Sequence, residues 1–189
     1  MRRLRREGWQ SDCCVVCTVE FFNDIKAGAG AFGPDVGNMA LRKALRLHDF
    51  TRGLTEDQIA SLAPAAGEIA FEENEIVLEE GQLSRALYLV MEGSVTVELH
   101  APRYVLALQA VEAGGAFGWS ALLDRQDTMF RVRAREHTRA LRLDGDALKA
   151  LCRQDPALGV ELLHRTLALV AGRVKATEIR FAEMCGVRV

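Results

Sequence analysis

The sequence lacks several features that mark large classes of protein. No apolar run reaches the ~18–20 residues that a membrane-spanning helix needs, so we expect no membrane segment. The formal net charge at pH 7 is only -2, which gives no excess of basic residues for a bulk attraction to nucleic acid. With 189 residues, 49% of them hydrophobic, the chain can bury the core of one domain with helical additions.

Cysteines and histidines are too scattered to build a metal or disulfide framework. The five cysteines are odd in number and without framework spacing, which favours a reducing compartment and a cytoplasmic protein. Cys14 and Cys17 form one CxxC without a second pair, so no zinc site is expected. A metal-dependent jelly-roll enzyme would cluster its histidines, whereas here they stand singly at His48, His100, His137 and His164. There is no Gly-x-Ser-x-Gly elbow either, so we predict that the chain is not an enzyme and holds no metal.

The N-terminal part divides into two segments. Residues 1–37 combine a basic start, a short cysteine-rich apolar stretch and small residues, and this weak similarity to a secretory signal is interrupted by Asp12 and Glu20. We predict a poorly ordered extension there. Residues 38–66 have helical periodicity, and Thr55 with Gln58 predicts a capping box at the start of a second helix.

Residues 67–146 have the pattern of short β-strands. Val95, Val97 and Leu99 alternate with polar residues, which is typical of a half-buried strand. Residues 86–91 are apolar on both faces, and glycine and proline turns separate the runs. The predicted fold class is α+β: an antiparallel β-roll of the jelly-roll type, with short N-terminal helices and a long C-terminal helix.

Residues 114–134, GGAFGWSALLDRQDTMFRVRA, have the pattern of a ligand-holding turn followed by a strand. Glycines allow the backbone to approach a ligand, and a helical turn opening at Gly118 would direct free N–H groups at an anion. On the strand, Phe130, Val132 and Ala134 share one face. The opposite face carries Arg131, Arg133 and Arg135. Thr128 has the parity of the apolar, inward set.

From about residue 54 to about residue 182 the chain resembles the cyclic-nucleotide-binding domain family, which includes the catabolite activator proteins and the regulatory subunits of cyclic-nucleotide-dependent kinases. Gly81 and Gly93 stand where that family places turns of its β-roll, and Phe117-Gly118 opens the phosphate-binding cassette. The resemblance implies a small-molecule site, with a cyclic nucleotide as the candidate ligand and no certain cofactor. Its residues would be Phe117, Gly118, Trp119, Ser120, Ala121, Leu122, Arg125 and Thr128.

Two positions depart from the family's nucleotide binders. Trp119 replaces the glutamate that holds the ribose hydroxyl, and Thr128 replaces the arginine that pairs with the cyclic phosphate. Arg125 is the remaining candidate for reaching a phosphate, while Thr128 could donate one neutral hydrogen bond. Because charge-assisted contacts are the stronger ones, we expect any affinity for a cyclic nucleotide to be weak.

The C-terminal third, residues 147–185, predicts helices that include one long helix. Asp155-Pro156 is a helix start, and a seam of residues then steps by three and four. The seam consists of Val160, Leu163, Leu167, Val170, Val174, Thr177, Phe181 and Met184. A helix to Cys185 would be about 45 Å long, with a second apolar stripe at Leu158, Leu162 and Leu169. The resemblance implies a homodimer through this helix; packing of the seam against its own domain stays the alternative.

Residues 186–189 have the character of a tail, and the five residues after Met184 are too few for a helix-turn-helix. We therefore expect no direct sequence-specific binding to DNA. Two functions stay open. One is a sensor that couples a small-molecule effector to the dimerisation helix. The other is a ligand-free dimeric module, its pocket closed by Trp119, Phe117 and Met129, which regulates an unidentified protein partner through the helix or the arginine face.

Overall fold

The computed structural model describes residues 34–101, 103–123, 127, 128 and 130–186. The chain divides into two units after Gly37, and nearly all of the described residues belong to the second unit, Asn38–Val189. Residues 1–33 of the predicted extension, with Cys14 and Cys17, lie outside the described residues.

Short helices precede the strands, as the sequence predicts. Helix α2 spans Pro34–Leu47 and so begins four residues before the predicted boundary, since proline fits the first turn of a helix. The short helix η2 spans Asp49–Thr51, α3 spans Glu56–Leu62 and η3 spans Ala63–Ala65. The predicted capping box is confirmed: the Thr55 hydroxyl accepts from Gln58 N at 3.2 Å, and Gln58 Oε1 accepts from Thr55 N at 3.0 Å.

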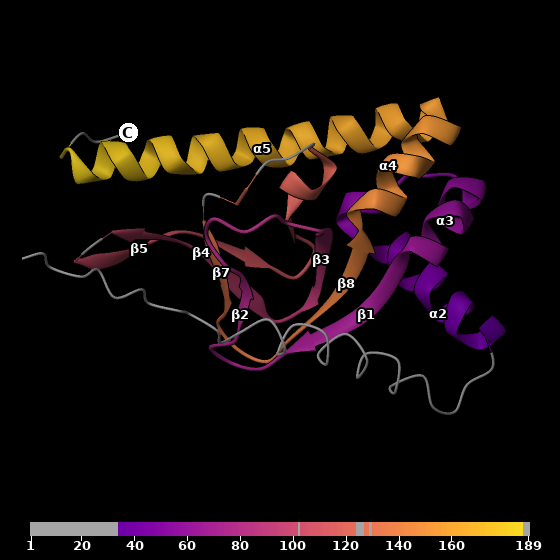
Figure 1. Cartoon of the computed structure of the whole chain (residues 1–189), viewed down its shortest axis with the longest axis horizontal. Helices are drawn as coiled ribbons and strands as arrows, with labels where there is room; N and C mark the ends of the chain where they lie inside the picture. The colour runs from indigo at the N-terminus through magenta and orange to yellow at the C-terminus, as the bar shows by residue number, and fades with distance from the viewer. Residues whose placement is uncertain (1–33, 102, 124–126, 129, 187–189) are drawn as a thin grey trace, which may run out of the picture. The chain divides into compact units, whose positions relative to one another are not determined.

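Eight strands form two four-stranded antiparallel sheets, which confirms the predicted β-roll (Figure 1). One sheet has the order β1-β8-β3-β6, with strands Ala66–Phe71, Thr138–Asp144, Ala86–Glu92 and Ala116–Phe117. The other has the order β2-β7-β4-β5, with strands Ile76–Leu78, Arg131–Ala134, Ser94–Ala101 and Tyr104–Glu112. Strands β3 and β4 are joined by Gly93, whose φ of 78° is the left-handed conformation that glycine adopts most readily.

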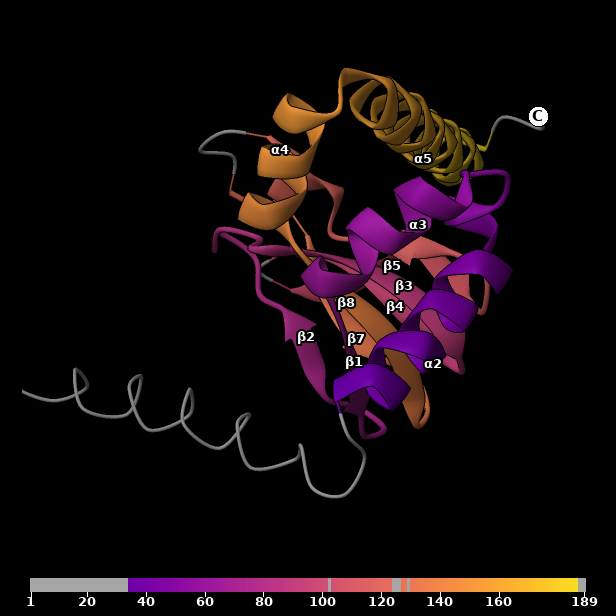
Figure 2. The ribbon, with the colours of Figure 1, turned by 90° about the vertical axis from the view of Figure 1, so that its right-hand side faces the viewer.

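Strand β3 supplies two hydrophobic cores because its alternate side chains point to opposite faces. Tyr88 and Val90 join the core between the two sheets, which also contains Val95 and Val132. Leu87 and Leu89 lie on the other face and pack under the helices. That second core includes Leu45, Ile59, Leu62, Leu148, Leu158 and Leu162. Figure 2 shows α2 and α3 against this face of the β1-β8-β3-β6 sheet.

Helices α4, Gly145–Gln154, and α5, Pro156–Met184, complete the fold. Asp155 caps α5, because its Oδ1 accepts from the backbone N–H groups of Ala157 and Leu158. At 29 residues α5 is about 43 Å long, close to the predicted length. No helix among the described residues is long and apolar enough to cross a membrane.

Two faces of α5 differ as the sequence predicts. Leu158 and Leu162 are buried against the domain, and Leu169 packs partly on the same core. The predicted seam is open, with half or more of the side chain exposed at Val160, Leu163, Leu167, Val174, Phe181 and Met184. Val170 and Thr177 are partly buried. The seam therefore does not pack against its own domain at most of its positions.

Candidate functional site

The cassette starts where β6 ends, at a glycine with left-handed backbone. Gly118 has φ 81°, and a Cβ atom built on it would lie only 2.4 Å from the Ala86 carbonyl oxygen. Any other residue would be both strained and crowded there. The short helix η4, Trp119–Leu122, follows directly, so the helical turn expected at Gly118 is confirmed.

A stack of aromatic rings fixes the floor of the site. Phe117 pairs with Tyr88 across β6 and β3, and their rings stack with centroids 4.8 Å apart and planes 8° from parallel. Phe71 meets Tyr88 edge-on at 6.1 Å. Such ring pairs add stability beyond the area they bury, so the position of Phe117 is well defined.

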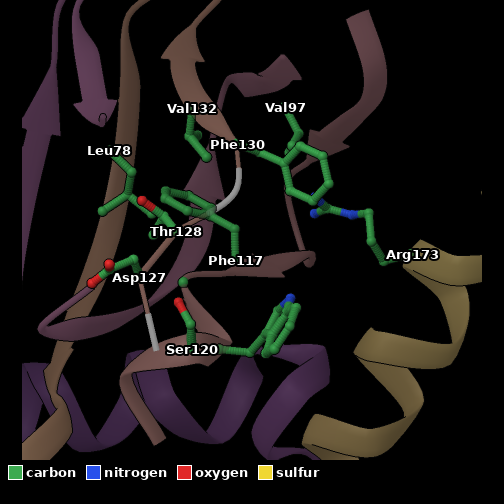
Figure 3. Close-up of a pocket in the computed structure, with 11 residues that line it drawn as sticks. Leu78, Val97, Phe117, Ser120, Asp127, Thr128, Phe130, Val132 and Arg173 are labelled. Carbon is green, nitrogen blue, oxygen red and sulfur yellow. The ribbon is translucent and has the colours of Figure 1, made fainter. Parts of the chain in front are cut away.

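A cavity of about 70 Å³ lies under the cassette (Figure 3). Of the predicted site residues, Phe117, Gly118, Trp119, Ser120 and Thr128 line it. Ala121 and Leu122, which are described, are not part of this lining. Ala121 is buried, Leu122 packs on the core beneath the helices, and Arg125 lies outside the described residues.

The rest of the lining is apolar except at two opposite ends. Leu78, Val97, Phe130 and Val132 come from strands of the second sheet or the segment that leads into it. Asp127 stands at the cassette end, and Arg173 reaches in from α5 (Figure 3). The described lining is thus an apolar surface with one carboxylate and one guanidinium.

Thr128 has the inward parity that was predicted, but its hydroxyl is engaged elsewhere. The Oγ1 atom lies 2.6 Å from the Glu79 carbonyl oxygen and 2.9 Å from that of Gln82. Its backbone N–H also donates to Gln82 O at 2.8 Å. In this structure the single hydroxyl proton of Thr128 ties the cassette to the β2–β3 turn, so it is not directed at the pocket.

The two arginines of β7, Arg131 and Arg133, point away from the pocket, as their alternation along the strand predicts. Each of them contacts a glutamate. Arg131 Nε donates to Glu79 Oε1 at 2.7 Å. Arg133 lies 3.4 Å from Glu98 and donates to the Asn74 carbonyl at 3.1 Å. Pairing neutralises much of the charge that Arg131 and Arg133 bring to this face. Arg135, just beyond the strand, is exposed.

Arg173 is the site residue that sequence reasoning missed. Its Nε donates to Gln109 Oε1 of β5 at 2.7 Å. Among the described residues, no carboxylate lies within 4.0 Å of its guanidinium nitrogens. Burial lowers the pKa of Arg173 from its usual value, because a charged group loses hydration there. Arg173 follows Leu169 by four residues and so continues the domain-facing stripe of positions 158, 162 and 169. This spacing is the sequence signal that could have identified Arg173 as a site residue.

A second cavity of about 390 Å³ is lined by residues of β5, by the turn at Gly114 and Gly115, and by Leu169 and Arg173 of α5. Trp119 and Arg173 border both cavities. Trp119 is half-buried and packs on the core beneath the helices, so it lines the first pocket without filling it.

The described residues bring together no group of three or more histidine, cysteine or acidic side chains that could hold a metal ion. Among the described residues the arrangement is suited to binding: it combines a partly open apolar pocket, a floor of stacked aromatic rings and one cation that belongs to a helix.

Sequence comparisons agree with this geometry. The family model of the cyclic nucleotide-binding domain matches residues 68–155. A protein named as a putative potassium channel protein of Rhodopseudomonas palustris is 32% identical over 105 residues, which is 56% of this chain and 25% of that protein. This chain therefore spans about a quarter of the length of that relative.

Solved structures share the fold. A cyclic nucleotide-binding domain from Methylobacillus flagellatus superposes with a TM-score of 0.66 at 22% identity, covering 80% of this chain and 86% of that one. The regulatory subunit of a cAMP-independent protein kinase A from Trypanosoma brucei gives 0.61 at 17% identity, over 79% and 52% of the two chains. The sensor domain of the transcriptional regulator DNR from Pseudomonas aeruginosa gives 0.60 at 16% identity, over 73% and 93%.

Proposed function

We propose that this chain, whose residues 68–155 match the family model of the cyclic nucleotide-binding domain, is a regulatory domain that couples a small anionic ligand under the cassette to pairing of α5. The family is one of regulators and sensors rather than catalysts, and the proposal accordingly includes no catalytic step and no direct reading of DNA. Its partners are a second copy of the chain, the ligand and a regulated protein.

The observation that carries the proposal is the position of Arg173. This residue lines the pocket and belongs to α5, while its Nε–H bonds to Gln109 on the roll. A ligand that contacts the guanidinium would thereby contact the helix, and a ligand can shift a helix only through contacts that differ between two states.

The open seam of α5 supports the homodimer. Apolar residues at a and d spacing are what a two-stranded helical pair buries, and here six of the eight seam positions are at least half exposed. Exposed apolar stripes of this kind mark interaction surfaces.

A ligand-free interaction module is the second candidate, and the size of the pocket favours it. About 70 Å³ is well below the ~300 Å³ at which sites for drug-sized ligands begin. The fold does not decide between the two candidates, since one fold serves many functions. The trypanosome relative, for example, is named as cAMP-independent.

Titration of methyl-labelled protein with cyclic AMP and cyclic GMP, followed by NMR, tests the proposal for the family's usual ligands. Binding under the cassette should shift the methyl signals of Val97 and Val132, which line the pocket, and should do so weakly because no arginine stands at position 128. Thermal unfolding at the same ligand concentrations is the second readout. If no methyl signal moves with these nucleotides or with a small carboxylate such as butyrate, the ligand-free module is the better account.

A further inference from the structure

We propose that the ligand of this pocket is a short-chain monocarboxylate, its carboxylate held by Arg173 and its apolar chain inserted under the cassette. This assignment rests on the proposed function and deepens it, because it names the chemical class of the ligand and the residue that selects it.

The charge of Arg173 is the first reason. The Nε–H is fixed by Gln109, and the terminal nitrogens have no carboxylate within 4.0 Å among the described residues. A partly buried guanidinium with no anion beside it has lost part of its hydration, which makes binding of an anion favourable. A carboxylate matches the planar fork of the guanidinium with two parallel hydrogen bonds.

The lining is the second reason. Away from its two charged ends the pocket presents chiefly apolar surface, from Leu78, Val97, Phe117, Phe130 and Val132. Figure 3 shows the Arg173 side chain extending from α5 towards Phe130, so its charge lies next to this apolar surface. A ligand with one charge and an apolar body is complementary to that arrangement.

The volume of the pocket limits the size of the ligand. An engineered cavity of about 150 Å³ in another protein accommodates benzene, so a volume of about 70 Å³ has room for a chain of only a few carbon atoms. Cyclic nucleotides are several times larger and would require the pocket to open.

The residues at the end of the pocket opposite Arg173 determine the orientation of the ligand. Asp127 brings a negative charge there, and the Thr128 hydroxyl already donates to backbone carbonyl oxygens. An anionic group is repelled by the first and gains no bond from the second. The carboxylate therefore lies at the α5 end, and the direction of the ligand follows from residues on two different elements.

The experiment is a titration of the full chain with sodium butyrate at pH 7 and constant ionic strength, followed by the Val97 and Val132 methyl signals. We expect saturable shifts with butyrate, and binding at least ~10-fold weaker with butyramide, which has nearly the same shape without the charge. Arg173→Gln should weaken butyrate binding by ~10-fold or more. Arg180→Gln, a matched loss of charge at an exposed position of the same helix, should leave it unchanged.

Folding of Arg173→Gln is checked by its circular dichroism and its unfolding midpoint, and Arg173→Lys, which keeps the charge, should retain more of the affinity than Arg173→Gln. Equal affinity of wild type and Arg173→Gln for butyrate would overturn the assignment, and so would equal affinity for butyrate and butyramide. If a cyclic nucleotide shifts the pocket methyls and butyrate does not, the proposed function stands and this inference fails. If neither shifts them, both fail.

Discussion

Gly118 is the residue on which the conformation of the cassette depends. With φ 81° and the Ala86 carbonyl oxygen only 2.4 Å from an added Cβ, Gly118→Ala combines backbone strain with overlap against main chain. We expect it to lower the free energy of unfolding by roughly 2–4 kcal/mol, measured by urea denaturation.

The matched control is Gly172→Ala on α5, where nothing lies within 4 Å of the added Cβ and the backbone is helical. This substitution should raise the free energy of unfolding by about 0.5–1 kcal/mol, because alanine loses less conformational freedom in a helix. Equal unfolding midpoints for the two variants would contradict the role given to Gly118.

His48 makes the stability depend on pH. It is 3% exposed; its Nδ1 accepts from Phe50 N at 3.1 Å, so its Nε2 carries the proton and donates to Val90 O at 3.1 Å. Burial lowers the pKa of His48 below 6.5, against smaller opposing effects of the Val90 carbonyl and the Asp49 carboxylate. A group whose pKa is lower in the folded than in the unfolded protein contributes stability above the unfolded value and loses it as the pH falls through the folded value.

The free energy of unfolding should therefore fall as the pH drops below about 6.5. Denaturation at several pH values measures this, with His48→Gln as the comparison in which the decrease is smaller. An NMR titration of His48 with a midpoint at or above 6.5 would show the sign to be wrong.

The face of the strand to which each residue points was predictable from the sequence, whereas the hydrogen bonds of individual side chains were not. Alternation placed Val132 inside and Arg131 outside, because a strand leaves no other choice. The two bonds of the Thr128 hydroxyl depend on a turn 46 residues earlier, and Arg173 enters the site from a helix 45 residues after Thr128. Helical spacing puts Arg173 on the domain-facing side of α5, but no local pattern shows that this side meets the pocket, so the sequence alone favours Arg125 instead.

At the scale of elements, the proposed pairing of α5 with a second copy of the chain leads to a direct prediction. Leu167 is 64% exposed at the centre of the seam, so Leu167→Glu removes nothing from the core of the domain. It would place two like charges in the interface of a helical pair, and we expect the dissociation constant of the dimer to rise by about 100-fold or more.

Sedimentation equilibrium measures the change, and Ala168→Glu is the control. Ala168 is exposed and next to Leu167 in the chain, but helical spacing puts it outside the seam. A wild-type chain that remains monomeric at high micromolar concentration would refute pairing through α5, and so would equal dissociation in the two variants.

Elements whose periodicity is local were predicted well, and their exact bounds less so. The capping residues Thr55 and Asp155 gave the starts of α3 and α5, because a cap is a bond between neighbours in sequence. The pairing of β1 with β8, between Ala66–Phe71 and Thr138–Asp144, joins segments far apart in the chain and was implied only by the family resemblance.

At the scale of the whole molecule, the two halves of α5 should differ in local stability. Leu158 and Leu162 anchor the first half, whereas residues 178–181 and 183–186 are exposed. Helix that lacks tertiary packing opens readily, so amide exchange in the second half should be fast in the Leu167→Glu variant and at least ~10-fold slower in the wild type at high concentration. Exchange that does not change with protein concentration would argue against pairing along this half.

Arg173 lies near the middle of α5, at the boundary between the anchored and the exposed half. Under the proposed pairing, ligand occupancy and assembly are two equilibria that share this one residue, and linkage makes each strengthen or weaken the other by the same factor. The dose of effector needed for a response would then vary with the copy number of the protein itself. A cell could tune the sensitivity of such a switch through expression level alone, with no change in the binding pocket.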